Sequence, residues 1–181
     1  MTSFKISKFR QRAVVNSKIE RKSNLFFGAE LPQVIIPNAI GHTSDEKRKS
    51  VFDWSIPRDG LDIKSPMKNG LIEDFEIFSE ILEHTVTKRL NSDMKETPIL
   101  MTEAAWNTRE KREKITEIMY EKFGTLAFFL VKSPVCVAFA NGRASGIVVD
   151  SGATHTTAVG VYEGHILRQL LNSFAYILNH N

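Results

Sequence analysis

The order of apolar and polar residues in the first half of the chain predicts strands and helices in turn. Residues 34–41 form an apolar run that Pro37 interrupts, which predicts a buried strand. Residues 71–90 carry apolar side chains three and four positions apart, which predicts a helix with one apolar stripe. The stripe consists of Leu71, Phe75, Phe78, Ile81, Leu82 and Val86. The short apolar run at residues 97–102 predicts the next strand.

The second half continues this alternation. Asn107 or Thr108 can cap a helix that runs to Phe123 and closes at Gly124. Three further strands are predicted, and the last forms a hairpin across Glu163 and Gly164. A short helix from Pro134 lies between the first two of these strands, and a terminal helix follows the hairpin. The strands cover residues 126–131, 145–150 and 156–162 with 165–167, and the terminal helix covers residues 168–181. Strands that alternate with helices predict an α/β fold whose sheet is at least partly parallel.

The segment between the first strand and the first helix differs from both. Residues 42–68 are polar and are broken by Pro57, Gly60 and Pro66, with a charged run at residues 45–49. Such a composition predicts a small inserted lobe at the surface rather than a part of the core.

Composition and charge narrow the class of protein. The chain has 181 residues, of which 42% are hydrophobic and 25% charged, as expected for one globular domain. Its apolar stretches are far shorter than the roughly 20 residues that span a bilayer, so we expect a soluble protein without a secretory signal. Cys136 is the sole cysteine, which excludes an internal disulfide and favours a reducing compartment.

The net charge of +3 comes from the start of the chain. Residues 1–25 hold seven Lys or Arg against the single acid Glu20, so the other residues hold 24 − 7 = 17 basic against 21 − 1 = 20 acidic side chains. A basic start can contact nucleic acid or an import receptor, or can simply be solvated.

Residues 146–156 are the clearest candidate for chemistry. An apolar strand ends there in Asp150 and continues into a turn of small residues. A carboxylate at a strand end can hold a hydrated divalent cation, and the backbone N–H groups of such a turn can bind phosphate. The same Asp-Ser-Gly sequence also occurs in ordinary hairpin turns, so the pattern alone leaves both interpretations open.

Three separated motifs resemble the actin superfamily. They lie at residues 102–114, 138–143 and 150–156, and a fourth at residues 65–75 agrees with them. The Trp106-Asn107 pair, the Ala-Asn-Gly-Arg run and the Asp-Ser-Gly-Ala-Thr-His-Thr loop resemble the nuclear actin-related proteins of the actin-like 6 class. The resemblance covers about residues 31–167.

The resemblance implies two similar α/β halves of the ribonuclease H type, with ATP and a divalent cation between them. Residues 1–25 would be a basic N-terminal segment, and residues 26–145 the first half with its inserted lobe at about 42–62. Residues 146–167 would begin the second half, and residues 168–181 would be a divergent C-terminal helix. We therefore expect an incomplete actin-like fold in a truncated chain, with part of its apolar sheet surface uncovered.

The resemblance also assigns site residues. Asp150 would contact the cation through water, and the phosphate-binding candidates are Asp150, Ser151, Gly152, Ala153, Thr154 and His155. Residues 16–19 align with the family's first phosphate loop but lack its acid and its glycine. Ser133 stands where actin has a water-orienting Gln. Phe139, Gly142 and Ala144 match the cleft with which family members hold partner helices.

These features predict a subunit without catalytic residues. The resemblance implies a nuclear protein of chromatin-remodelling complexes of the SWI/SNF type and of histone acetyltransferase complexes, which regulates transcription. Its partners would be a helix of the remodelling motor, actin and other subunits, with nucleic acid contacted only indirectly and no membrane. ATP and magnesium are the cofactors that the resemblance allows. The alternatives are an ATP-binding or ATP-hydrolysing cytoskeletal actin-like protein, and a truncated product with little independent function.

Two further features have a plain interpretation beside a functional one. Trp106 can anchor a partner or pack in the core, since Trp is enriched at interfaces and also in interiors. His155 can contact phosphate or satisfy a buried hydrogen bond. The alternating charges of residues 109–114 predict a solvated helix face.

Overall fold

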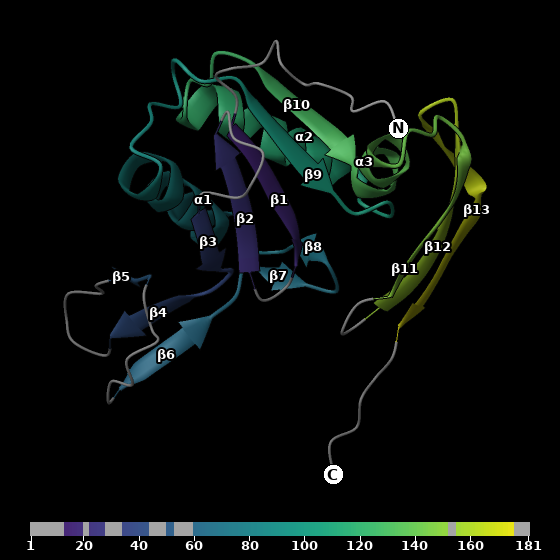
Figure 1. The fold of residues 1–181 in the computed structure, drawn as a ribbon. Helices are drawn as coiled ribbons and strands as arrows, with labels where there is room; N and C mark the ends of the chain where they lie inside the picture. The colour runs from purple at the N-terminus through teal and green to yellow at the C-terminus, as the bar shows by residue number, and fades with distance from the viewer. Residues whose placement is uncertain are drawn as a thin grey trace.

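The computed structural model describes residues 13–19, 22–27, 34–43, 50–52, 60–151 and 155–175. Its centre is a five-stranded sheet with the order β10-β9-β1-β2-β3 (Figure 1). The strands β1, β9 and β10 are parallel, whereas β2 and β3 are antiparallel to their neighbours. The bounds are β1 Ala13–Ile19, β2 Lys22–Phe27, β3 Val34–Pro37, β9 Ile99–Glu103 and β10 Phe128–Lys132. The predicted α/β fold with a partly parallel sheet is confirmed.

Both β1 and β2 belong to this sheet. Residues 13–19 and 22–25 of the predicted basic segment 1–25 thus lie in strands of this sheet, and the predicted division of the chain into segments stays a prediction. Pairing of β1 with both β2 and β9 places it between two strands, which its basic flanks do not reveal. Residues 1–12 lie outside the described part of the chain.

Two long helices cover one face of the sheet. α1 (Phe75–Glu83) and α2 (Arg109–Glu117) continue as the π-helical segments η1 (His84–Arg89) and η2 (Ile118–Lys122). The first helix starts later than predicted because Asp74 caps it, with Oδ1 accepting from the amides of Glu76 at 3.1 Å and Ile77 at 2.9 Å. The second is capped by Thr108, one of the two residues that the sequence offered.

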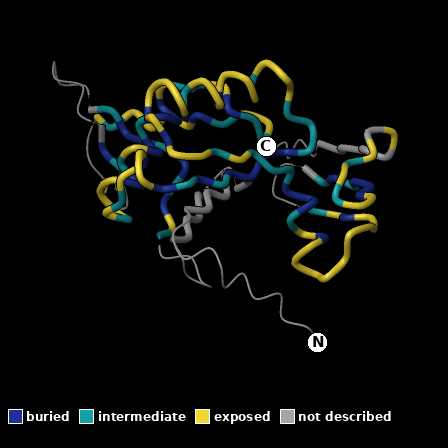
Figure 2. The backbone as a smooth tube through the Cα atoms, turned by 90° about the horizontal axis from the view of Figure 1, so that it is seen from above, coloured by how far each residue is buried: buried dark blue, intermediate teal, exposed yellow. Residues whose placement is uncertain are grey.

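The main core lies between these helices and the sheet. Buried apolar residues of both helices pack there against β9, and Figure 2 shows helical turns whose inner side is buried and whose outer side is exposed. Phe128 and Leu130 of β10 also face this core. The buried members are Ile72, Phe78, Leu82, Val86, Met94, Ile99, Met101, Ile115, Met119 and Phe123.

Among the described residues, the opposite face of the sheet carries both packed and exposed apolar side chains. α3 (Ser133–Ala140) packs there, because Val131 of β10 contacts the cluster around α3 rather than the main core. Beyond α3, Phe129 is 62% exposed, and Ile35 on the far edge strand is 55% exposed. Apolar side chains of described residues are thus exposed on this face, and an uncovered sheet surface in a truncated chain stays a prediction.

A second sheet packs on the other side of α3. It has the order β11-β12-β13, all antiparallel (Figure 1). Val148 and Val161 of this sheet pack on Val135 and Ala138 of α3. The bounds are β11 Gly146–Ser151, β12 His155–Tyr162 and β13 His165–Ala175.

The terminal helix predicted at residues 168–181 is wrong as far as Ala175, because this segment extends β13. Leu171 pairs with Val159 and Phe174 pairs with Thr156, across a register shift next to Gly160. These long-range pairs override a helical spacing of apolar residues that is weak by itself. Residues 176–181 lie outside the described part.

The inserted segment forms its own small sheet, in the order β5-β4-β6. The predicted strand 34–41 is divided at Asn38 and Ala39, directly after Pro37, so that its second part is β4 of this lobe. The lobe strands are β4 Ile40–Thr43, β5 Ser50–Val51 and β6 Leu61–Lys64, and β7 Met67–Lys68 pairs with β8 Leu71–Ile72 before α1. The charged run at residues 45–49 lies outside the described residues. None of the described helices is long and apolar enough to cross a membrane.

Candidate functional site

The predicted phosphate-binding residues lie at one end of the β11–β12 hairpin. Asp150 is half-buried opposite Thr157, and Ser151 is exposed opposite Thr156. The hydroxyls of Ser151 and Thr156 are hydrogen-bonded at 2.9 Å, which closes the ladder at its last pair. Gly152, Ala153 and Thr154 form the connection itself and lie outside the described residues, as does the side chain of His155, whose backbone begins β12. The phosphate cradle therefore stays a prediction.

The described residues fit a metal site poorly. Asp150 stands at the strand end as expected, but within the described part of the chain no three His, Cys, Asp or Glu side chains gather around a common point. Magnesium is held through several oxygen ligands, and one carboxylate binds it mainly through water. We therefore derive no reaction step through magnesium or ATP.

The segment that aligns with the first phosphate loop is part of a strand. Asn16 pairs with Thr102 of β9 on one side and with Asn24 of β2 on the other. The register then shifts before Ile19, which pairs with Lys22. The backbone of Asn16 thus lies between two paired strands, which differs from a free phosphate loop.

Ser133 occupies the position of the water-orienting Gln, and its hydroxyl is already used. It is the first residue of α3, is 4% exposed, and donates from Oγ to the carbonyl oxygen of Glu103 at 2.8 Å. A short, buried side chain that donates to the backbone cannot hold a water molecule against a phosphate.

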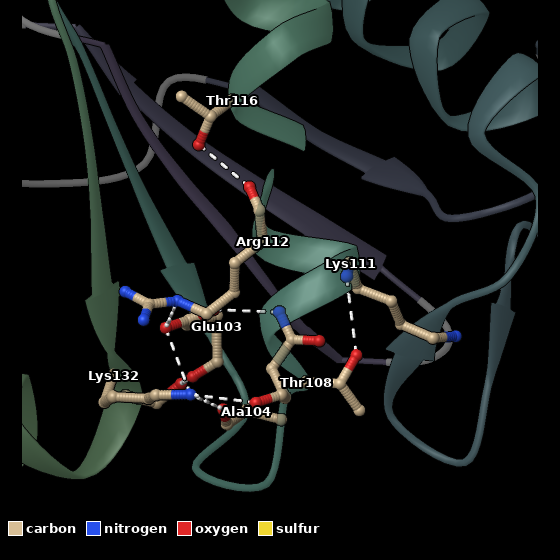
Figure 3. A network of polar contacts seen from close by, with 9 residues as sticks. Glu103, Ala104, Thr108, Lys111, Arg112, Thr116 and Lys132 are labelled. Carbon is tan, nitrogen blue, oxygen red and sulfur yellow. Dashed lines mark hydrogen bonds and ion pairs between the residues drawn. The ribbon is translucent and has the colours of Figure 1, made fainter. Parts of the chain in front are cut away.

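Glu103 is the centre of a polar network that the sequence analysis missed (Figure 3). Its side chain is 3% exposed, and Oε1 lies 2.9 Å from Arg112 Nε and 3.1 Å from Lys132 Nζ. The amide of Asn107 donates to Oε2 at 2.8 Å, and Lys132 Nζ also donates to the carbonyl of Ala104 at 3.2 Å. The network joins the ends of β9 and β10 to α2.

A signal for this network exists in the sequence. Glu103 and Lys132 each end an apolar strand, and in the parallel pairing of β9 with β10 they are direct partners. Opposite charges at the ends of two adjacent strands can therefore be paired once the register is known. Arg112 is the member of the charged run 109–114 that reaches this buried carboxylate, so this residue departs from the predicted solvated face.

Trp106 is half-buried and packs against the β7–β8 turn. Its ring lies so close to Gly70 that an added Cβ would meet the ring at 2.9 Å, and Gly70 has φ +73°. The indole Nε1 donates to the carbonyl oxygen of Asn69 at 3.2 Å. Of the two interpretations of Trp106, these contacts favour packing within the fold.

The partner-cleft candidates all lie at the end of α3 and in the connection to β11. Phe139 is 52% exposed, and Gly142 and Ala144 are exposed as well. The ring of Phe139 lies against Gly164 at the β12–β13 turn, where an added Cβ would meet it at 2.8 Å. The amide of Gly164 donates to the carbonyl of Ala144 at 2.9 Å. The structure thus joins Phe139 and Ala144 to the second sheet, while the amide of Gly142 donates to the carbonyl of Phe139 at 2.9 Å.

Comparisons with known proteins agree with the fold. The family model described as Actin matches residues 26–175. Actin-related protein 4 of Arabidopsis thaliana is 39% identical over 119 residues, which cover 66% of this chain and 27% of that protein. Actin-related protein 4 of Oryza sativa subsp. indica is 40% identical over 112 residues, covering 62% of this chain and 25% of that protein. Actin-related protein 4 of Gibberella zeae is 28% identical over 185 residues, which cover 80% of this chain and 39% of that protein.

The chain belongs to the actin family, as the resemblance predicted. It spans about a quarter to two fifths of the length of these relatives. Its mixed α/β architecture is that of an incomplete actin-like fold, with one five-stranded sheet, two three-stranded sheets and one two-stranded sheet among the described residues.

Proposed function

We propose that this actin-related chain is a non-catalytic subunit of nuclear chromatin-remodelling complexes of the SWI/SNF type, shared with histone acetyltransferase complexes. In this role it binds a helix of the remodelling motor together with actin, and it contributes to transcriptional regulation by assembly rather than by turnover. The chain resides in the nucleus and meets nucleic acid through its partners.

The state of Ser133 carries the non-catalytic part of the proposal. Its hydroxyl is buried and donates to the Glu103 backbone, so the position of the water-orienting side chain serves packing instead. Phosphoryl transfer depends almost entirely on positioning the nucleophile and stabilising the charge of the transition state. Ser133, directly after β10, does not position a water molecule for such an attack. The strand pairing of Asn16 supports the same conclusion.

Exposed apolar residues support a role in assembly. Phe139 lies at the end of α3, and on the second sheet Ile147 is 73% and Val149 is 67% exposed. Val148 faces α3, so its neighbours Ile147 and Val149 lie on the opposite face of the sheet. Apolar surface of this kind is typical of protein contact sites. The resemblance of the motifs to the nuclear actin-like 6 class, and the similarity to relatives named actin-related protein 4, support the choice of complex.

Affinity purification from nuclear extract tests the proposal. Tagged full-length chain should recover the motor subunit and actin. Phe139→Asp should lose the motor, because a charge then stands in the apolar surface, whereas Leu126→Asp is the matched control, since Leu126 is 63% exposed and lies elsewhere. Recovery of neither protein by the unmodified chain, with cytosolic staining, would instead favour a product with little independent function.

A cytoskeletal, ATP-hydrolysing role is the second candidate. It requires a phosphate site at residues 150–155 that works without the first loop and without the water-orienting side chain. The half-buried Asp150 at the end of β11 is the described feature that favours it. Tight ATP binding that Asp150→Ala abolishes would support this alternative.

A further inference from the structure

Three Ser-Pro or Thr-Pro pairs occur in the chain, and the structure separates them. They are Ser65-Pro66, Thr97-Pro98 and Ser133-Pro134. Thr97 and Ser133 are each 4% exposed, and their hydroxyls are hydrogen-bonded to Ser92 and to the Glu103 backbone. Ser65 is exposed.

Ser65 also has the sequence context of a kinase substrate. Lys68 stands two residues after Pro66 and is exposed, which gives the pattern Ser-Pro-x-Lys. Kinases of the proline-directed class require the proline after the acceptor, and those among them that also prefer a basic residue prefer it at this spacing. Thr97 and Ser133 have no Lys or Arg at that position. We propose that Ser65 is a phosphorylation site for a proline-directed protein kinase and that its phosphorylation releases the inserted lobe. This proposal does not depend on the proposed function.

Ser65 lies in the neck of the lobe, which we define as the two connections at residues 38–39 and 65–66. Its Oγ donates to the carbonyl oxygen of Asn38 at 3.1 Å and accepts from the amide of Met67 at 3.2 Å. Asn38 is 2% exposed. The hydroxyl therefore links the connection that enters the lobe to the connection that leaves it.

The neck is in turn held to the start of α1. Pro66 is fully buried, and its carbonyl accepts from the amides of Glu73 at 2.8 Å and Asp74 at 3.2 Å. Asp74 is the residue that caps α1. A change at Ser65 is thus transmitted both to the lobe and to the helix cap.

Phosphorylation removes the link by simple chemistry. Ser65 Oγ bonds to the γ-phosphorus of ATP while the bond from that phosphorus to the bridging oxygen breaks, so that ADP leaves and the hydroxyl proton passes to the base of the kinase. The phosphoserine carries a charge of about −1.5 to −2 and offers acceptors in place of the donor. It cannot donate to the Asn38 carbonyl, and the two groups repel. Lys64 and Lys68, both exposed, attract the phosphate toward solvent.

Because Pro66 is buried, the kinase can act only on a locally opened conformation of the chain. A kinase must take the proline into its own site, so residues 61–68 have to open locally before transfer. The phosphate then prevents the original hydrogen bond from forming again, and the open neck persists until a phosphatase acts.

The test treats the purified full chain with a proline-directed kinase and magnesium ATP, followed by peptide mass mapping. We expect one phosphoryl group on Ser65 and none on Thr97 or Ser133. Ser65→Ala should abolish the modification, and Ser65→Thr should restore it as a Thr-Pro substrate. Lys68→Gln should slow it several-fold, whereas Lys64→Gln, the matched control on the other side of Ser65, should not.

Hydrogen exchange measures the release of the lobe. After phosphorylation, amides of residues 40–43 and 61–68 should exchange faster, while those of α2 should not change. Modification at Thr97 or Ser133 without Ser65, an unmodified chain, or equal rates for Lys68→Gln and Lys64→Gln would overturn the assignment of the site. A phosphorylated Ser65 with unchanged exchange would overturn the release of the lobe.

Discussion

Replacing Glu103 by Gln tests whether the network at the strand ends stabilises the fold. The carboxylate is 3% exposed, with Arg112 Nε at 2.9 Å, Lys132 Nζ at 3.1 Å and the Asn107 amide at 2.8 Å. Gln keeps the size and one acceptor but removes the negative charge. Its NH2 group would then face either both cations, which contact Oε1, or the side-chain NH2 group of Asn107, which contacts Oε2, and each of these groups is a donor.

The expected loss can be bounded from general magnitudes. Breaking a fully buried ion pair costs about 3–5 kcal/mol, and a hydrogen bond to a charged group contributes about 1.5–3 kcal/mol. Here the Arg112 side chain is 45% exposed and the Lys132 side chain 21% exposed, so water partly solvates both once the carboxylate is gone. We therefore expect Glu103→Gln to lower the free energy of unfolding by roughly 2–3 kcal/mol.

Glu113→Gln is the matched control. Glu113 also pairs with an arginine Nε, that of Arg109, at 2.7 Å, but the two side chains are 62% and 86% exposed. Exposed pairs of this kind contribute little because water and salt screen them. Urea unfolding followed by circular dichroism gives both free energies, provided that the slopes agree. Equal losses in the two variants would show that burial of Glu103 does not decide its contribution, and the reasoning would fail.

Three more predictions follow from named contacts. Gly164→Ala places a Cβ 2.8 Å from the Phe139 ring at a residue with φ +78°, whereas the Cβ of Gly142→Ala, at φ +68°, meets nothing within 4 Å. Gly164→Ala should therefore unfold at a distinctly lower urea concentration than Gly142→Ala. Equal unfolding midpoints would contradict the contact with Phe139. Burial, and then the nearby cations Arg89 and Lys88, lower the pKa of His84, so the folded state favours its neutral form. The contribution of neutral His84 to the free energy of unfolding is therefore present above about pH 6.5 and is lost as the pH falls. His84→Phe should therefore lose less stability between about pH 7 and pH 5 than the unmodified chain, and an equal loss would show that other groups govern the pH dependence. Purified chain with magnesium and ATP should release no phosphate above background, and turnover that Asp150→Ala abolishes would contradict this.

Elements with local signals were predictable from the sequence. Thr108 caps α2 because its side chain accepts from the amide of Lys111, and Gly124 ends that helix with φ +61°. The hairpin turn at Glu163 and Gly164 also follows from local chemistry, since both residues have positive φ. In these segments the residues that begin or end an element lie directly beside it in the sequence.

Elements that depend on distant partners were not predictable in this way. Apolar residues at 170, 171 and 174 have a spacing that suits a helix, yet pairing with β12 makes this segment a strand. The sequence likewise gives no register for β9 and β10, and without it Glu103 and Lys132 cannot be recognised as partners. The cleft residues Phe139, Gly142 and Ala144 could be singled out only through the resemblance, because the contacts of Phe139 and Ala144 with the second sheet join separate parts of the chain.

The end of β9 anchors α3, which bears on the choice between a role in assembly and a role in ATP hydrolysis. Ser133 and Lys132 both bond to Glu103, through its backbone and its side chain, and they start the helix that carries Phe139. A sheet edge that can position a reacting nucleotide needs side chains that are free to meet it. Because Ser133 and Lys132 instead fix α3 to the five-stranded sheet, and α3 in turn holds the three-stranded sheet, this edge sets the geometry of the surface proposed for partners. Substitutions at Ser133 or Lys132 should therefore change assembly before they change any nucleotide chemistry.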